Sequence, residues 1–301
     1  MNDKLVQIEL WLDCPVNCRF CCLGKFKKIT SDTYKISIME KAINLLDEIN
    51  WGEYDKLAII GGEIFYGEYS PQLAELFNKF IEKIIIFLRK NVIKRFYIMT
   101  SLMYLNNYFY NMIEQFKEWG LSDKILICSS YDTKYRFNQV NKIEFDKNVK
   151  YLNNNKIGMH FEIILTQFFI DDYMNKNNEL MNIISNYPID ILRPARSWKM
   201  KKEDQPQDFF PKRVAYMQWL SDLKGTNKEL LFSLFDMKNR ASLVYCLSNG
   251  TEIVRGSNNI DDIQHNINQC GHDDLYCCYG DSDECIVCDT NKFKRLIECE
   301  M

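Results

Sequence analysis

The sequence lacks a long hydrophobic run. Its most apolar stretch, Ile84–Leu88, is flanked by Lys83 and Arg89 and is far shorter than the roughly 20 residues of a membrane-spanning helix. The sequence also lacks a secretory signal, because its first residues include Asp3 and the apolar run that follows is short and strand-like. These absences argue against a membrane or secreted protein and predict a soluble protein of the cytoplasm.

An excess of either charge is also missing. The formal net charge is -3 over 301 residues, and the sequence pI is about 5.8. Proteins that bind nucleic acid through a broadly basic surface have a much higher pI, so the charge balance argues against a nucleic-acid partner. The residues are 47% hydrophobic and 14% aromatic, which excludes a disordered chain and is enough for a large core. The length fits one large domain, or a domain with an appendage.

Cysteine, in contrast, is abundant and unevenly distributed. Of twelve cysteines, four lie within residues 14–22, one is Cys128, and seven follow from Cys246 onward. In a reducing compartment, cysteines act as metal ligands more often than as disulfides. We therefore expect metal binding by the first cluster and by the cysteine-rich tail.

The first cluster has the spacing Cys14-x3-Cys18-x2-Cys21, with the aromatic residue Phe20 before the third cysteine. Three thiolates on one short loop suit an iron–sulfur cluster that keeps one iron open, since ordinary clusters take four cysteines. A structural zinc site closed by Cys22 or by a distant cysteine is an alternative, and so are buried thiols without metal.

A second motif follows the next expected strand. Residues 56–63 read as a buried strand that ends in Gly61, Gly62 and Glu63. Glycines at a strand end let the backbone approach a ligand closely, although a plain turn with a solvated glutamate gives the same pattern. Its place after the second strand, as the cysteine loop follows the first, strengthens the functional interpretation.

Strands and helices are expected to alternate along the first two thirds of the chain. The expected strands are 5–12, 56–63, 96–102, 124–132, 158–166 and 189–195. The expected helices are 38–49, 71–89, 106–119, 143–152 and 172–185. The first is placed by its apolar spacing, and the second by Ser70 as N-cap and Pro71 at the first helical position. This alternation predicts an α/β fold with a parallel sheet, a partial (β/α)6 TIM-like barrel. In such folds the chemistry lies at the carboxyl ends of the strands, where both motifs fall.

Composition divides the chain into three expected parts. Residues 1–198 form the partial barrel, and residues 199–245 form a charged, proline-marked linker with a helical segment. Residues 246–301 form a small cysteine-rich domain, with turn signals at Asn249-Gly250 and Gly256. This last part has little apolar pattern, so a metal would supply the missing folding free energy.

The pairing of Cys14-x3-Cys18-x2-Cys21 with Gly61-Gly62-Glu63 resembles the radical S-adenosylmethionine (SAM) enzymes. The resemblance implies that the three cysteines hold a [4Fe–4S] cluster whose open iron binds the amino and carboxylate groups of SAM. It implies an enzyme of oxidoreductase or maturase type that reductively cleaves SAM to a 5′-deoxyadenosyl radical, which abstracts hydrogen from a substrate. A reductase such as flavodoxin or ferredoxin would supply the electron.

The same resemblance implies roles for other residues near the first two motifs. Phe20 would pack near the adenine of SAM. Gly62 and Glu63, after Gly61, would meet the amino group of its methionine part.

Further along the chain, the resemblance is looser. Thr100 and Ser101 stand where some members of the family have Thr-Asn-Gly, but the asparagine and glycine are missing here. Ser129 or Ser130, together with Arg136, resemble the serine and arginine that contact the ribose or carboxylate of SAM in several subfamilies. An arginine suits a carboxylate by bidentate geometry, although Arg136 on a plain surface is an alternative.

The cysteine-rich tail resembles the auxiliary-cluster domains called SPASM or twitch, which occur on radical SAM enzymes that act on peptides and proteins. The spacing departs from their C-x2-C-x5-C-x3-C pattern, and a hairpin is expected after Cys246. The expected auxiliary ligands are first Cys270, Cys285, Cys288 and Cys299, then Cys246 and Cys278. A structural zinc bound by four cysteines, or by three with His272, is the alternative.

The tail's resemblance implies a peptide or protein side chain as substrate. The short segment before Cys14 counts against a leader-dependent peptide enzyme unless a partner protein supplies the recognition. A radical SAM enzyme for a small molecule or nucleoside is one alternative, and a non-catalytic iron–sulfur or zinc binding module is another. Cys128 is interpreted as a hydrogen donor or a small buried thiol, and His160 as a core histidine.

Overall fold

The computed structural model describes residues 5–16, 18, 30–131, 139–165, 191–196, 242–246 and 251–255, with side chains through Phe161. Several residues expected to be functional lie outside this part of the chain: Phe20, Cys21, Arg136, Cys270, Cys278, Cys285, Cys288 and Cys299. The helix expected at 172–185 lies outside it as well.

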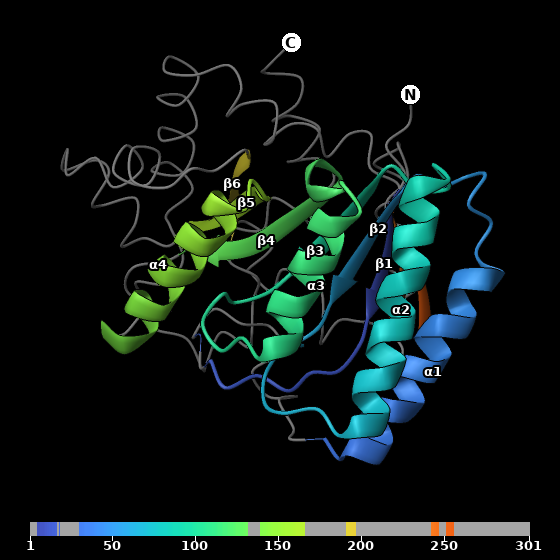
Figure 1. Ribbon diagram of the computed structural model, residues 1–301, viewed down its shortest axis with the longest axis horizontal. Helices are drawn as coiled ribbons and strands as arrows, with labels where there is room; N and C mark the ends of the chain where they lie inside the picture. The colour runs from blue at the N-terminus through green and yellow to red at the C-terminus, as the bar shows by residue number, and fades with distance from the viewer. Residues whose placement is uncertain are drawn as a thin grey trace, which may run out of the picture.

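One sheet joins all the described strands, in the order β6-β5-β4-β3-β2-β1-β7-β8 (Figure 1). The strands are β1 (Leu5–Glu9), β2 (Lys56–Ile60), β3 (Arg95–Met99), β4 (Ile125–Tyr131), β5 (Gly158–Leu165), β6 (Ile191–Arg196), β7 (Ser242–Cys246) and β8 (Thr251–Arg255). Strands β1 to β6 lie side by side in chain order, and each is parallel to its neighbours. The α/β fold with a parallel sheet is confirmed, and consecutive parallel strands are the arrangement of a TIM-like barrel core.

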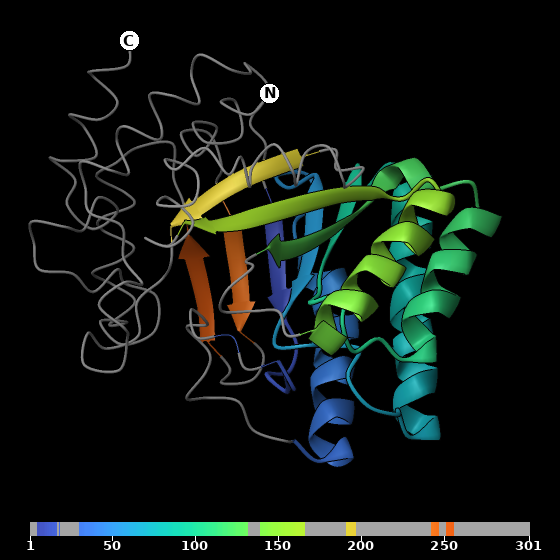
Figure 2. The ribbon, with the colours of Figure 1, turned by 90° about the vertical axis from the view of Figure 1, so that its left-hand side faces the viewer.

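The connecting helices lie on one face of this sheet (Figure 2). They are α1 (Asp32–Glu48), α2 (Pro71–Arg89), α3 (Asn107–Glu118) and α4 (Gln139–Asn154), with a short 3-10 turn at Ser122–Lys124. None of the helices in the described part of the chain combines the length and hydrophobicity that crossing a bilayer requires.

Serine side chains fix where two of the helices begin. Ser70 accepts a hydrogen bond from the Leu73 amide, and Pro71 occupies the first turn of α2, as the sequence predicted. Ser31 caps α1 in the same way, so that this helix begins at Asp32 instead of at Ile38. The apolar periodicity, which placed the start at Ile38, is not recognisable in the first turns of α1. The capping serine marks where the helix begins.

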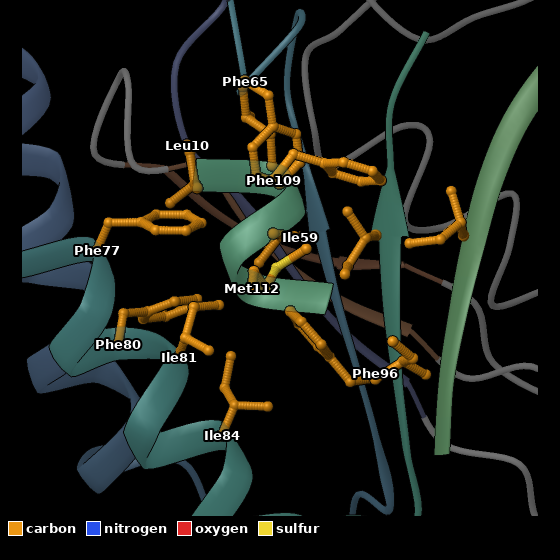
Figure 3. Packing of buried hydrophobic residues seen from close by; sticks show 14 of the residues in the cluster. Leu10, Ile59, Phe65, Phe77, Phe80, Ile81, Ile84, Phe96, Phe109 and Met112 are labelled. Carbon is orange, nitrogen blue, oxygen red and sulfur yellow. The ribbon is translucent and has the colours of Figure 1, made fainter. Parts of the chain in front are cut away.

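Apolar side chains fill the space between the sheet and the helices (Figure 3). Phe80 of α2 and Phe109 of α3 are fully buried; Phe80 points toward Ile59 of β2, and Phe109 packs against Phe65 with ring centroids 5.0 Å apart (Figure 3). Burial of each such side chain contributes about 2 kcal/mol of hydrophobic stabilisation. This layer holds the strands in place and thereby fixes the positions of their carboxyl ends.

The opposite face of the sheet carries more polar and sulfur-containing groups. Side chains alternate along a strand, so residues between the helix-facing ones point away from the helices. Cys128 of β4 and His160 of β5 are partners in register on that face, and both are buried. Cys128 Sγ lies 3.8 Å from His160 Nδ1. Cys128 is therefore a buried thiol, and its role as a hydrogen donor stays a prediction.

Strands β7 and β8 extend the sheet beyond β1. They pair in antiparallel fashion around residues 247–250, which confirms the hairpin expected near Asn249-Gly250. The sequence did not predict that β7 pairs in parallel with β1. Through this pairing, Cys246 is in register with Glu9 at the carboxyl ends of the two strands. The division of the chain at residues 198 and 245 stays a prediction.

Candidate functional site

Cys14 and Cys18 follow the carboxyl end of β1. Cys14 is partly exposed and Cys18 is buried, and both are thiols instead of disulfide partners. Within the described residues no three potential ligands gather as a metal site, and the third cysteine of the motif, Cys21, lies outside those residues. The structure thus places two of the three expected ligands on one short segment at the carboxyl edge of the sheet.

The glycine motif lies directly against the segment that leads into Cys14. Beyond the last paired residues of β1 and β2, the Gly62 amide donates to Trp11 O at 2.9 Å, and the Glu63 amide donates to Asp13 O at 2.6 Å. Main-chain hydrogen bonds between the two segments therefore continue past Ile60, up to the residue before the first cysteine. The two motifs that the sequence placed at neighbouring strand ends are in main-chain contact.

Gly61 and Gly62 have a steric reason to be glycines. A Cβ atom on Gly61 would come closer than 3.0 Å to Trp11 O, and one on Gly62 closer than 3.0 Å to Asp13 O. Real Cβ atoms essentially never approach a carbonyl oxygen so closely. The close approach that the sequence suggested for a ligand is made here by the backbone of residues 11–13. A side chain at either glycine would push the cysteine loop away from β2.

Glu63 is fully buried, which rules out the plain turn with a solvated glutamate. Its carboxylate accepts hydrogen bonds from Thr100 Oγ1 at 3.0 and 2.9 Å, from the Ser101 amide at 2.6 Å and from Ser101 Oγ. The Phe65 amide donates to Oε1 at 3.3 Å. The carboxylate therefore ties the carboxyl end of β2 to that of β3.

Two opposing effects act on the pKa of Glu63. Burial raises this pKa above its ordinary value, because a charge is poorly solvated inside the protein. The hydrogen bonds from Ser101 and Thr100 lower it, but they offset the effect of burial only in part. The net direction is upward.

Thr100 and Ser101 act as hydrogen-bond donors to Glu63, a role that sequence reasoning missed. Thr100 Oγ1 also accepts from the Leu102 amide at 3.1 Å, and Ser101 Oγ accepts from the Met103 amide at 3.3 Å. These bonds hold the turn after β3, where Leu102 has a positive φ of 60°. The signal in the sequence was that two hydroxyl residues lie at the end of one expected strand and Glu63 lies at the end of the strand before it.

The two candidate serines of β4 lie on opposite faces. Ser129 is buried and in register with Phe161, on the face that the helices cover, whereas Ser130 is partly exposed. Because side chains alternate, Ser130 shares with Cys128 the face opposite to helices α1 to α4. Of the two, Ser130 is thus on the side away from the helices.

The fold is shared with structures that contain SAM. No protein-family model matches the sequence, and no curated protein matches it. Native anSMEcpe with bound AdoMet and Cp18Cys peptide aligns with a TM-score of 0.52 at 16% sequence identity, over 80% of this chain and 63% of that chain. Hexahistidine-tagged anSMEcpe with bound AdoMet aligns with a TM-score of 0.52 at 17% identity, over 81% of this chain and 61% of that chain.

A weaker similarity links the chain to coproporphyrinogen III oxidase (HemN) from Escherichia coli, which is described as a radical SAM enzyme. It has a TM-score of 0.47 and 10% identity, over 96% of this chain and 76% of that chain. At these identities the comparisons concern the fold. The chain spans less than two thirds of the length of the two anSMEcpe structures.

Proposed function

We propose that this protein is a radical SAM enzyme that acts on a peptide or protein side chain. The observation that carries the proposal is the main-chain contact between Gly62-Glu63 and Trp11–Asp13. It brings together the two sequence motifs on which the resemblance rests. The fold shared with AdoMet-bound anSMEcpe supports the proposal independently.

The residues that are present fit a [4Fe–4S] cluster and SAM. Cys14, Cys18 and Cys21 would hold the cluster, since three thiolates leave one iron open for SAM. A cluster bound there would supply the electron for the reductive cleavage of SAM and thereby the abstraction of a hydrogen atom from the substrate. The protein's part is to hold the thiols, orient SAM and keep water away from the reacting carbon.

Gly62 and Glu63 remain the proposed residues at the amino group of SAM, and we propose a different role for each. The Glu63 carboxylate is buried and already accepts hydrogen bonds from Thr100, Ser101 and Phe65. It would therefore act on SAM indirectly, by holding the strand ends. Main-chain carbonyl groups of Gly61 and Gly62 would accept hydrogen bonds from the amino group of SAM, since the Gly62 and Glu63 amides already bond to Trp11 O and Asp13 O. Ser130 and Arg136 are the proposed contacts to the ribose or carboxylate of SAM.

An auxiliary iron–sulfur cluster in the tail is the second part of the proposal. Cys246 ends β7 in register with Glu9, at the edge of the sheet from which the Cys14 loop leaves. A tail cluster that uses Cys246 would therefore begin on the same side as the proposed SAM site. The peptide substrate is supported by one of the anSMEcpe structures, which holds the Cp18Cys peptide together with AdoMet.

Anaerobic reconstitution tests the proposal directly. Protein loaded with iron and sulfide, then given dithionite and SAM, is expected to form 5′-deoxyadenosine, detected by liquid chromatography and mass spectrometry. Cys18→Ala should abolish this product, because two thiolates cannot hold the cluster. Cys22→Ala is the matched control, since Cys22 lies beside the motif but outside its spacing.

Two results would reject the proposal. Purified protein that contains zinc and takes up no iron would indicate a zinc-binding module. Iron-loaded protein without 5′-deoxyadenosine would indicate a non-catalytic iron–sulfur module.

A further inference from the structure

Asp13, the residue just before Cys14, joins the two ends of the cysteine loop. Its Oδ1 accepts hydrogen bonds from the Thr30 amide at 2.9 Å and from Thr30 Oγ1 at 2.8 Å. Its Oδ2 lies 2.6 Å from Lys35 Nζ in α1. Thr30 lies 17 positions after Asp13, so these bonds close the segment that carries Cys14 and Cys18.

The main chain and neighbours of Asp13 are fixed as well. Asp13 O accepts the hydrogen bond from the Glu63 amide. Lys35 Nζ lies 5.6 Å from the centre of the Trp11 ring, which is fully buried. One residue thus connects the carboxyl end of β1, the carboxyl end of β2 and the beginning of α1.

The Asp13–Lys35 ion pair is buried to an extent that limits its net contribution to stability. The side chains of Asp13 and Lys35 are only 2% and 10% exposed. Removing two charges from water costs much of what their attraction returns, so a buried pair is weak evidence for stabilisation. The ion pair and the two Thr30 bonds instead fix the position of Asp13 relative to Thr30 and Lys35, because charge-assisted hydrogen bonds are short and directional.

We infer that Asp13 is a positioning residue for the cysteine loop. By fixing both ends of the loop, it keeps the Cys14 and Cys18 thiols near each other before any metal binds, and it offsets part of the entropy cost of closing the segment. The use of these thiols as cluster ligands rests on the proposed function. The bonds by which Asp13 joins the two ends of the loop do not depend on the proposed function.

Thiol reactivity in metal-free protein tests this inference without SAM or iron. Under anaerobic conditions, iodoacetamide is added and the alkylation rates of Cys14 and Cys18 are followed by peptide mass spectrometry. Asp13→Asn, which keeps the shape but removes the charge, should raise the rate at buried Cys18 about tenfold, because a charge-assisted bond is lost. Thr30→Val should raise the alkylation rate of Cys18 less, since the hydrogen bond from the main-chain amide of residue 30 to Asp13 Oδ1 remains.

Two references make the measurement specific. Cys128, buried in β4, reports global unfolding and should react at the wild-type rate in both variants. Asp55→Asn removes a more exposed ion pair, between Asp55 Oδ2 and Lys94 Nζ at 2.8 Å, which joins the amino ends of β2 and β3. It should leave Cys14 and Cys18 unchanged.

The outcomes separate this inference from the proposed function. Wild-type rates at Cys18 in both Asp13→Asn and Thr30→Val would overturn the inference, and so would a parallel rise at Cys128. If Asp13→Asn does not fold, Thr30→Val decides alone. A selective rise at Cys18, in a protein whose wild-type form makes no 5′-deoxyadenosine, would support the positioning role while the proposed function fails.

Discussion

At the scale of single residues, Glu63 joins the carboxyl ends of β2 and β3. Its carboxylate is fully buried and accepts bonds from Thr100, Ser101 and Phe65. The sequence predicted a functional role for Glu63 from its place after two glycines. It did not predict the donors, because the sequence does not show that the Glu63 side chain is buried and directed toward the end of β3.

The raised pKa of Glu63 leads to a pH dependence of stability. A carboxyl whose pKa is higher in the folded protein binds its proton more tightly there, so its stabilising contribution is complete below its ordinary pKa of 4.5. That contribution is lost as the pH rises through the folded value. We expect the free energy of unfolding of the wild type, relative to Glu63→Gln, to fall as the pH rises above 4.5.

Urea unfolding at several pH values, followed by circular dichroism, measures this difference. Glu118→Gln, at an exposed position near the end of α3, should keep the wild-type pH dependence. A difference that instead grows with pH would mean that the hydrogen bonds outweigh burial and hold Glu63 ionised.

At the scale of elements, local signals predicted some boundaries and missed others. Helix α2 begins and ends where Ser70, Pro71 and its apolar stripe predicted, because cap, first turn and periodicity agree. Strand β7 has only five residues, and its partner β1 lies at the other end of the sequence. No local pattern specifies such a pairing, since it depends on contacts between distant segments.

The contact between the ends of β1 and β2 makes Gly62 a sharp test at this scale. In Gly62→Ala the new Cβ would meet Asp13 O, and backbone atoms on both sides must shift. Overpacking of this kind costs about 1–3 kcal/mol, so we expect a lower unfolding midpoint. Because the shift moves the segment before Cys14, faster alkylation of Cys18 should accompany it.

Gly52→Ala is the control for that experiment. Its Cβ would meet only a side-chain oxygen of Asn50, at 3.2 Å, which can move. If Gly62→Ala has the same unfolding midpoint and the same alkylation rate of Cys18 as Gly52→Ala, the two strand ends are not tightly packed.

At the scale of the whole molecule, the sheet gathers both cysteine-bearing segments on one edge. Helices α1 to α4 cover one face (Figure 2), while Cys128 and His160 lie on the other. The carboxyl ends of β1 and β7 carry the Cys14 loop and Cys246. The sequence predicted the first of these positions from the βα pattern. It could not predict the second, because the place of β7 beside β1 follows from the assembled sheet.

Iron content tests whether the tail completes this edge with a second cluster. One [4Fe–4S] cluster gives about four iron atoms per chain, and an occupied tail gives about eight. We expect about eight in the reconstituted wild type and about four in a variant with Cys270, Cys285 and Cys288 all changed to alanine. This variant keeps the Cys14 motif, so it should still form 5′-deoxyadenosine from SAM, whereas Cys18→Ala should lose that product and keep the tail's iron. About four iron atoms in the wild type, together with one bound zinc, would instead identify the tail as a structural zinc site.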